Sequence, residues 1–422
     1  MQTRYIASIV IEANTPLKVG SSDIDMLQDS PVQKDWNELP MILGTSIAGV
    51  LRKEFSKDMA NDIFGDEHSK QKDNKGSRII ISNALLCDSN MKVVEKLDLE
   101  KNDFLKIFDN LPIREHTAIT DKGVAKENSK FDEEIVYKGA RFRFRLEFIG
   151  DENDKENWQE ILKTINSKTF RLGGGTTKGF GDIKVLNEFC SYDIFDIKSK
   201  EYQEKSSSLN TTYSKPFPKE QKDINYTIYI LKITPDDFFL FGSGFGDDEA
   251  DMTPVYEKVV DYDKATLSEE MILIPASSIK GAISHRTTYH YNLQNKLFIG
   301  NSEAKESIKE IFGEAKQSDE NLGFKGKVIF SDCFKPKVKE KVFDHVAIDR
   351  FTGGGIDGAL FQEKTIADDR EYIIEILLEK GIDEVYIKAF ESSLDDICSG
   401  MLPLGGTTTK GHGVFNGSWN KR

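Results

Sequence analysis

An internal repeat constrains the fold of this chain more than any other feature. The segment RLGGGTTKGFGDIKV, residues 171–185, resembles PLGGTTTKGHGVFNG, residues 403–417. Placing Lys178 on Lys410 sets an offset of 232 residues (410 − 178). The same offset superposes two further pairs: Ser46 on Ser278, and Gly49 on Gly281. A repeat of this length exceeds any solenoid unit, which spans at most about 50 residues, so it predicts two tandem copies of one domain.

Composition narrows the class of protein. No run approaches the roughly 18 apolar residues of a membrane span, and the start MQTRYIASIV lacks the pattern of a secretory signal, so we expect a cytoplasmic protein with no membrane partner. The four cysteines are scattered singly, which favours buried thiols over disulfides or zinc. A net charge of −14 argues against nucleic-acid binding through overall positive charge, but it leaves room for a local basic groove.

Alternating strands are predicted near the start of each half, over residues 5–13 and 226–234. Each strand leads through an acidic loop to a helix, and a further strand, helix and strand follow. This order predicts an α+β fold in each half, of the ferredoxin type. Residues 198–223 are polar and rich in serine, with little to bury, and we interpret them as a linker. The predicted domains are therefore 1–197 and 224–422.

The two predicted helix starts read TSIAGVLRKEF and SSIKGAISHRT, with Thr45 and Ser277 as plausible N-caps. Ser46 in the first half, and Ser278 with Lys280 in the second, place hydroxyls and an ammonium where the helix dipole favours an anion. Simple capping is the alternative. Each helical region later reaches an Ile-Phe-Gly stop, at residues 63–65 and 311–313.

The glycine-rich segments could bring a backbone close to another chain, with Lys178 or Lys410 holding a phosphate. They are neither a Walker loop nor a dinucleotide fingerprint. The alternative is a tight packing turn that carries a surface lysine.

Acidic loops separate the first strand from the helix in each half. Gly20 and Asp29 map onto Gly242 and Asp251 at an offset of 222 residues (242 − 20), and each aspartate shortly precedes a Pro-Val pair. An acidic loop is normally only solvated, but matching aspartates at matching places favour a functional role.

A third pair of anchors lies deeper in each half. His116 maps onto His345 at an offset of 229 residues (345 − 116), and we interpret both histidines as structural. Turn-rich segments follow them and predict protruding hairpins. Arg141 begins the segment RFRFRLEF, whose alternation places arginines on one strand face and phenylalanines on the other.

Together these motifs resemble the RAMP superfamily of CRISPR proteins, most closely the backbone subunits of type III effector complexes. The residues that carry the resemblance are LGTSIAGVLR and IPASSIKGAISHR, REHTAIT and DHVAIDRFTGGGIDGALF, GGGTTKGFG and GGTTTKGHG, and QDSPVQKD and ADMTPVYEK. The resemblance implies two modified ferredoxin-like (RRM-like) domains that grip guide RNA. It also implies thumb hairpins, over residues 119–135 and 348–364, that kink the guide at intervals of about six nucleotides.

The resemblance further implies Mg²⁺-dependent cleavage of target RNA beside each kink, with Asp29 and Asp251 as the catalytic and metal-binding residues. Guide RNA, target RNA and other effector subunits are the expected partners. The residues expected to contact RNA are Ser46, Ser278, Lys280, Lys178, Lys410, Arg141 and Arg350.

Two other functions remain open at this point. One is a guide-binding structural subunit with cleavage elsewhere in the complex. The other is a guide-processing ribonuclease that would use a histidine general base and need no metal.

Overall fold

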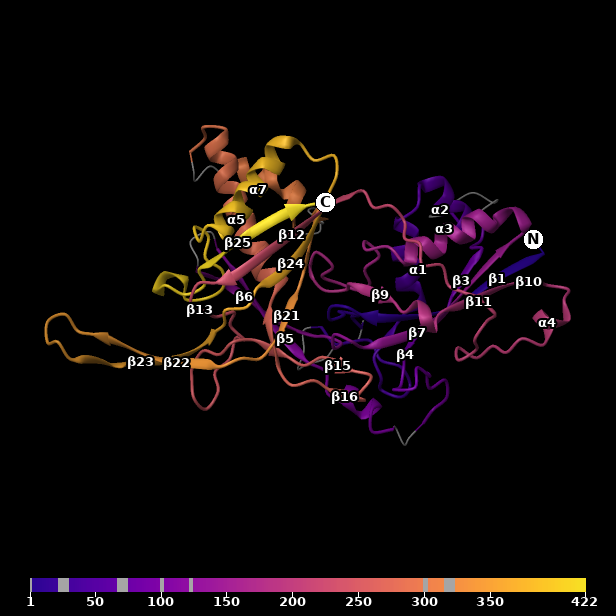
Figure 1. Cartoon of the computed structure of the whole chain (residues 1–422), viewed down its shortest axis with the longest axis horizontal. Coiled ribbons are helices and arrows are strands. Elements are labelled where there is room, and N and C mark those ends of the chain that lie inside the picture. The colour runs from indigo at the N-terminus through magenta and orange to yellow at the C-terminus, as the bar shows by residue number, and fades with distance from the viewer. Residues whose placement is uncertain are drawn as a thin grey trace.

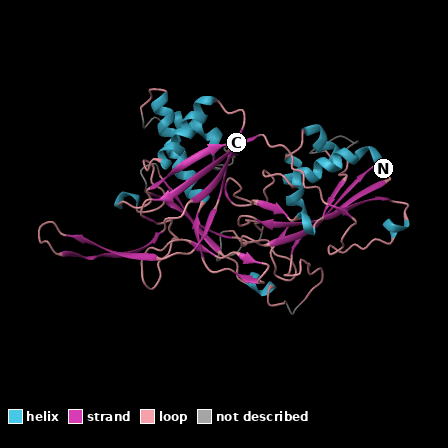
Figure 2. Ribbon diagram, in the orientation of Figure 1, coloured by secondary structure: helices cyan, strands magenta, loops and turns pink. Residues whose placement is uncertain are grey.

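The computed structural model describes residues 2–21, 30–66, 75–98, 102–120, 124–298, 303–314 and 323–422. The chain is an α+β protein in which two repeated halves lie side by side (Figure 1). Each half has a twisted sheet with its helices packed on one face (Figure 2). The repeat predicted from the sequence is therefore present as two similar layered units.

The first half is built on a long central strand, β1, which is buried along most of its length. The sheet order is β11-β10-β1-β7-β4-β2, with β3 also pairing β7 and β9 also pairing β1. The strands are β1 (Thr3–Ala13), β2 (Met41–Ile42), β3 (Ile79–Ile81), β4 (Ala84–Leu86), β7 (Arg141–Gly150), β9 (Ile183–Val185), β10 (Ser191–Asp196) and β11 (Lys215–Pro216). The helices are α1 (Gly44–Lys53), α2 (Lys57–Phe64), α3 (Lys155–Ile165) and the short α4 (Lys200–Gln203).

The second half has the sheet order β25-β12-β24-β20-β8. The strands are β8 (Lys178–Gly179), β12 (Tyr226–Pro235), β20 (Val328–Ser331), β24 (Tyr372–Glu379) and β25 (Phe415–Lys421), and the helices are α5 (Ala276–Gln294), α6 (Glu303–Phe312) and α7 (Glu384–Cys398). Helix α5 lies between β12 and β20 in the chain, and α7 lies between β24 and β25. Strand β8 comes from the glycine-rich segment of the first half, so one sheet contains both halves.

Two long hairpins leave these sheets. In the first half β5 (Ile113–Ile119) pairs with β6 (Ala125–Glu134), and in the second β22 (Glu340–Ile348) pairs with β23 (Gly355–Ala367). The second hairpin extends away from the body of the molecule (Figure 1). The remaining short strands are β13 (Phe238–Phe239), β14 (Tyr256–Glu257), β15 (Val260–Asp261), β16 (Thr266–Leu267), β17 (Met271–Ile274), β18 (Gly313–Glu314), β19 (Phe324–Lys325) and β21 (Cys333–Pro336).

The helix boundaries test the sequence reasoning closely. The Ile-Phe-Gly stops are confirmed, because α2 and α6 end at Phe64 and Phe312, and the glycines that follow have φ values of 84° and 83°. The predicted N-caps are wrong. Thr45 and Ser277 lie inside the first turns, and the leading amides are satisfied from a distant strand end. The Asn83 side chain accepts from the amide of Gly44 at 2.9 Å, and Asp332 accepts from that of Ala276 at 2.8 Å.

The halves interlock through the hairpin of β15 and β16. Val260 and Tyr262, from the second half, are buried in the hydrophobic core of the first. The Tyr262 hydroxyl donates to the Cys87 carbonyl at 3.0 Å and accepts from the Arg141 amide at 3.0 Å. Because the Tyr262 hydroxyl of the second half makes these hydrogen bonds to the first half, the contact orients one half on the other.

The segment 198–223 is held more firmly than its composition suggests. Phe217 is buried in the first core, and β11 pairs with β10. The Asn210 side chain exchanges hydrogen bonds of 2.9 Å with the backbone of Val93. The expectation that this segment has little to bury is therefore wrong, while the boundaries at 198 and 223 stay predictions.

Within the described residues, no helix is both long and apolar enough to cross a membrane. Cys87, Cys190 and Cys333 are buried thiols, and Cys398 is half-buried. Burial raises the pKa of Cys87 and Cys190 to about 12, so these thiols stay protonated and unreactive.

Candidate RNA interface and acidic loops

The glycine-rich loops fold against the chain that follows the first strand of each half. The amide of Gly174 donates to the Lys18 carbonyl at 2.7 Å, and that of Gly406 donates to the Leu240 carbonyl at 2.7 Å. The preceding glycines, Gly173 and Gly405, have φ values of 85° and 92°, and a Cβ at either would lie 2.4 Å from the same carbonyl oxygen. Only glycine fits this close approach, which explains why the sequence repeats.

In the first half this loop faces the start of helix α1. A groove of about 250 Å³ lies between them and is lined by Ser46, Gln33, Lys18, Gly173 and Gly174, among others. Ser46 is exposed at this groove. The structure therefore brings together the helix start and the glycine loop, which the sequence singled out separately.

In the second half the helix start receives the glycine loop of the first half. Lys280 is only 9 % exposed, and its Nζ donates to the Thr177 hydroxyl at 3.1 Å. Burial, reinforced by Lys178 and Lys325, lowers the pKa of Lys280 to about 8. Within the described residues neither Lys178 nor Lys280 has a carboxylate partner. In a chain of net charge −14, this junction is a local cationic site beside a helix N-terminus.

The other predicted RNA contacts are placed differently. Ser278 and Arg350 are exposed, the latter at the tip of the β22–β23 hairpin. Arg141 forms an ion pair with Glu12 at 2.7 Å and lies 4.4 Å from the Tyr262 ring, so it contributes to the contact between the halves. Lys410 lies 3.2 Å from the Glu363 carboxylate. The predicted RNA contacts are therefore not gathered in one place.

The acidic loop of the second half is attached to the base of the β22–β23 hairpin. The amide of Asp251 donates to the Gln362 carbonyl at 3.0 Å, and its Oδ2 accepts from the Gln362 amide at 2.8 Å. The Lys364 amide donates to the Met252 carbonyl at 2.8 Å. These bonds place the exposed Asp251 carboxylate at the edge of β23.

The first half repeats this attachment. The amide of Glu134 donates to the Ser30 carbonyl at 3.2 Å, and Ser30 maps onto Met252 at the offset of 222 residues (252 − 30). Asp29 directly precedes Ser30 in the sequence, but it lies outside the described residues. The described end of the loop therefore meets the hairpin at the same place in both halves.

A metal would need ligands from outside the described part of the chain. No group of three His, Cys, Asp or Glu side chains among the described residues could hold one. Mg²⁺ typically takes one or two carboxylates, with phosphate oxygens and water completing its shell. Asp251, exposed and beside the hairpin base, fits that mode of binding only when RNA supplies the other ligands.

The hairpin of the first half reaches the acidic loop of the second. A Cβ at Gly244 would lie 3.2 Å from the Glu115 Cβ, and the Lys130 ammonium is 4.8 Å from the centre of the Phe245 ring. The loop that carries Asp251 is therefore contacted by β5 and β6, although its residues 244–249 stay exposed. The base of the second hairpin instead pairs with β13 and with the acidic loop of its own half.

The sequence matches a known family in two places. Residues 10–184 and residues 242–416 each match the RAMP superfamily. The chain belongs to the RAMP superfamily. The two RAMP regions include both acidic loops, both hairpins and both glycine loops, so each repeated feature falls inside a family match.

A search of solved structures finds a match to part of the chain. A chain from a cryo-EM structure described as the apo state of type III-B Cmr-beta matches with 16 % sequence identity and a TM-score of 0.33, covering 43 % of this chain and 96 % of that one. No curated protein sequence matches this chain.

Each RAMP region has a carboxylate at the base of its hairpin that was not predicted from the sequence. Glu133 lies 3.4 Å from the His116 Nε2, and Glu363, which has no exposed surface, lies 3.1 Å from the His345 Nε2. The signal was present in the sequence as the repeated FDE and FQE, residues 131–133 and 361–363. Such short matches become informative only when the structure places His116 and His345 against their glutamates.

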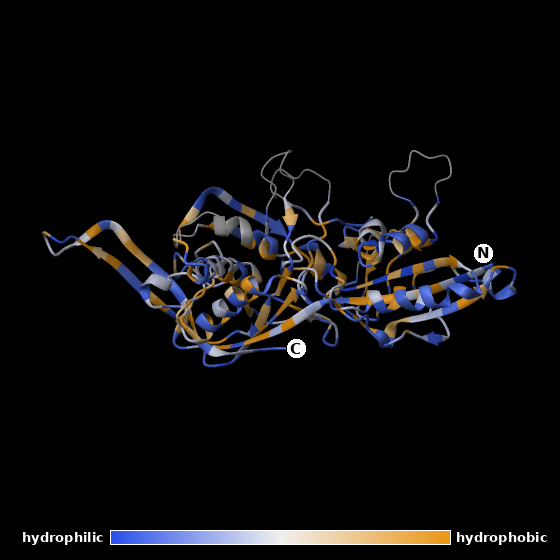
Figure 3. Cartoon of the chain, turned by 90° about the horizontal axis from the view of Figure 1, so that it is seen from above, coloured by the Kyte–Doolittle hydropathy of each residue, from blue (hydrophilic) through white to orange (hydrophobic). Residues whose placement is uncertain are grey.

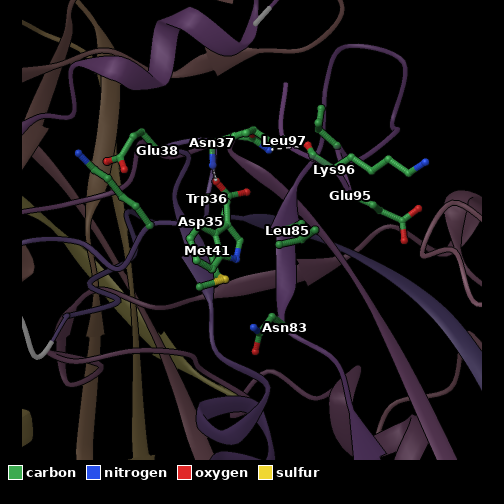
Figure 4. A pocket seen from close by; sticks show the side chains of 12 residues that line it. Asp35, Trp36, Asn37, Glu38, Met41, Asn83, Leu85, Glu95, Lys96 and Leu97 are labelled. Carbon is green, nitrogen blue, oxygen red and sulfur yellow. Dashed lines mark hydrogen bonds between the residues drawn. The ribbon is translucent and has the colours of Figure 1, made fainter. Parts of the chain in front are cut away.

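A larger cavity of about 510 Å³ is lined by residues of the first RAMP region (Figure 4). Trp36, which is 90 % exposed, lies at its edge with Leu97, and Met41 lines both this cavity and the groove at Ser46. An exposed indole beside a groove is a surface on which an unpaired base can stack.

Proposed function

We propose that this RAMP protein is a subunit of a type III CRISPR complex that binds guide RNA along its backbone and cuts complementary target RNA at two sites with Mg²⁺. The observation that carries the proposal is the cationic junction of Lys178 and Lys280. A buried ammonium with lysine neighbours and no described carboxylate partner is destabilising in the free protein. A phosphate group bound there would offset that cost.

The strand order supports RNA binding by a modified ferredoxin-like core. In the second half, β25-β12-β24-β20 places the fourth strand beside the first and the third beside the second, with α5 and α7 as the connecting helices. The first half has the same order in β10, β1, β7 and β4. RRM domains, which share this order, bind single-stranded RNA.

The attachment of each acidic loop to a hairpin supports the proposed target cleavage. If each hairpin acts as a thumb that kinks the guide, target backbone beside the kink would face Asp251 in the second half and Asp29 in the first. A carboxylate there can hold Mg²⁺ against a phosphate. In a purely structural guide-binding subunit, the same hairpins would position RNA but the aspartates would be dispensable.

Substitution of Lys280 tests the proposed RNA interface. In Lys280→Met we expect RNA affinity to fall roughly tenfold and the slope of its logarithm against log salt to decrease by about 1, because one phosphate contact is lost. The free protein should become more stable. The pKa of Lys280 is lowered to about 8, so the unfolded chain binds more protons than the folded one between about pH 8 and pH 10.5. Below about pH 8 the residue is charged in both states, and the buried charge opposes folding.

The stability of wild-type protein should accordingly rise between about pH 8 and pH 10.5, and Lys280→Met should flatten that rise. Binding is measured by filter retention at several salt concentrations, and stability by thermal unfolding. Lys388→Met is the matched control, because Lys388 is exposed on α7 and, among the described residues, forms an ion pair with Glu384 alone, at 3.1 Å. RNA affinity that is equal in the two variants would contradict the proposed interface.

The second hairpin gives an independent test of the thumb assignment. Its outer part carries exposed apolar side chains: Val346, Ile348, Phe351, Ile356 and Leu360. Hydrophobic stretches, in orange, lie along this arm in Figure 3. Phe351 is 99 % exposed. Deleting residues 353–358 should remove one interruption from the periodic protection of bound guide RNA while the rest persists. An unchanged nuclease footprint would exclude a thumb role for this hairpin.

A further inference from the structure

The base of the second hairpin holds a histidine against a buried carboxylate. His345 on β22 stacks on Phe361 on β23, with ring centres 4.8 Å apart. Its Nε2 lies 3.1 Å from Oε1 of Glu363, and the Nε2 of His412 lies 2.9 Å from the same oxygen. The imidazole of His345 therefore lies between an aromatic ring and a buried carboxylate.

The first half repeats this arrangement with different neighbours. His116 stacks on Phe131 at 5.1 Å, and its Nε2 lies 3.4 Å from Oε2 of Glu133. Between these shared positions the sequence differs, since Asp132 stands where the second half has Gln362. The histidine, phenylalanine and glutamate are the same in both halves, although the residue between the last two differs. This repetition favours a role in the function that the halves share.

The carboxylate also sets which nitrogen of the histidine is basic. Although burial raises it, the hydrogen bond and the charge of the Lys410 ammonium hold the pKa of Glu363 below its usual value, so this group stays charged. A charged carboxylate facing Nε2 favours the tautomer in which Nε2 carries the proton. The other nitrogen, Nδ1, is then free to accept one.

The histidine lies close to the acidic loop. Strand β22 pairs with β23, and Met252, which follows Asp251, bridges β23 at Glu363. Neighbouring strands are about 4.8 Å apart, so the backbones at His345 and Asp251 are roughly 10 Å apart. Both side chains can therefore reach one sugar-phosphate unit between them. His345 has 28 % of its side chain exposed, which leaves the ring accessible.

We propose that His345 and His116 are the general bases of two RNA-cleaving sites, with Glu363 and Glu133 as their positioning residues. This inference rests on the proposed function. Nδ1 takes the proton of a target 2′-hydroxyl, and the 2′-oxygen forms a bond to the adjacent phosphorus. The bond from phosphorus to the 5′-oxygen breaks with its electron pair, and that oxygen takes a proton from water. The imidazolium then returns its proton to the hydroxide, leaving a 2′,3′-cyclic phosphate and a 5′-hydroxyl.

The test uses the assembled complex with guide and complementary RNA, in which the cut from each half is an internal control for the other. In His345→Ala we expect the second-half cut to slow by roughly 10²–10⁴-fold, while the first-half cut and RNA binding stay unchanged. His116→Ala should show the reverse. Added imidazole should restore part of the lost rate, and the wild-type product should end in a cyclic phosphate.

The pH profile separates a base from a merely structural histidine. Wild-type cutting should rise with pH and then level off, and the second-half cut of His345→Ala should lose that rise. The group facing the ring is Glu363 on β23, and Lys410 and His412 on the glycine loop contact the same carboxylate. Asp344, the next residue on β22, and Asp251 on the acidic loop both accept from Gln362. In Glu363→Gln we expect a slower second-half cut with a displaced pH profile.

His290→Asn is the matched control, because His290 also pairs with a carboxylate, Asp396, at 2.6 Å, but between α5 and α7. Both cuts should persist in it. If His345→Ala cuts at the wild-type rate, or loses both cuts equally, the assignment of the histidine as a base is wrong, while the proposed cleavage still stands. Absence of any cut in the wild-type complex would refute the proposed cleavage, and the inference with it.

Discussion

Replacing Asp251 with alanine is expected to abolish one of two cuts, about six nucleotides apart, that the assembled complex makes in target RNA with Mg²⁺. The rate of that cut should fall by roughly 100-fold or more, because a metal held beside the phosphate contributes several kcal/mol to the transition state. Target binding should be nearly unchanged, since an exposed carboxylate adds little affinity for a phosphate backbone. The measurement is the cleavage pattern of end-labelled target.

Asp29→Ala should erase the other cut, and removal of Mg²⁺ with EDTA should erase both. Asp248→Asn is the matched control, because this residue lies in the same loop and neither matches the repeat nor bonds to the hairpin among the described contacts. If both cuts persist in Asp251→Ala and in Asp29→Ala, the aspartates are not catalytic, and the function of this subunit is guide binding. Loss of the second-half cut in Asp248→Asn, but not in Asp251→Ala, would move the metal ligand along the loop.

Much of this architecture was predictable because the two halves repeat. Matching residues at a fixed offset identified both glycine loops, and the structure explains the match through a carbonyl that no Cβ could approach. The Ile-Phe-Gly stops were equally readable, because a glycine at positive φ ends a helix wherever it occurs. Signals of this kind depend on local backbone geometry, which the sequence encodes directly.

Contacts between distant residues were not predictable in the same way. Thr45 was expected to cap its own helix, yet the cap is Asn83, 39 residues away from Gly44. Lys280 was expected to contact RNA, and no feature of the sequence indicated that the first-half glycine loop would lie against it. A single sequence gives no sign of which strand end or loop will meet a helix start, because that depends on how the two halves pack.

A buried arginine, Arg114, contributes to the packing of the two halves. It begins the first hairpin, is 4 % exposed, and lies 2.7 Å from Glu257 and 2.8 Å from Asp332 of the second half. Burial alone would lower the pKa of Arg114, but the two carboxylates raise it. Asp332 also accepts from the Ala276 amide, so the arginine connects the first hairpin to the start of helix α5.

Arg114→Met is therefore expected to destabilise the protein by about 3–5 kcal/mol, because two buried carboxylates lose their counter-charge. The apparent melting temperature should fall by roughly 5–10 °C. The triple variant Arg114→Met, Glu257→Gln, Asp332→Asn should recover most of this loss, since neutral amides need no cation. Lys106→Met is the control, because the Lys106–Asp103 pair at 2.8 Å lies at the surface, where ion pairs contribute little.

The same substitution has a consequence for cleavage. Because Arg114 places the first hairpin over the loop that carries Asp251, loosening it should reduce the second-half cut more than the first-half cut at temperatures where the protein stays folded. Equal effects on the two cuts would show that Arg114 acts only on stability. A melting temperature unchanged in Arg114→Met would show instead that other contacts, such as Tyr262 in the first core, suffice to hold the halves together.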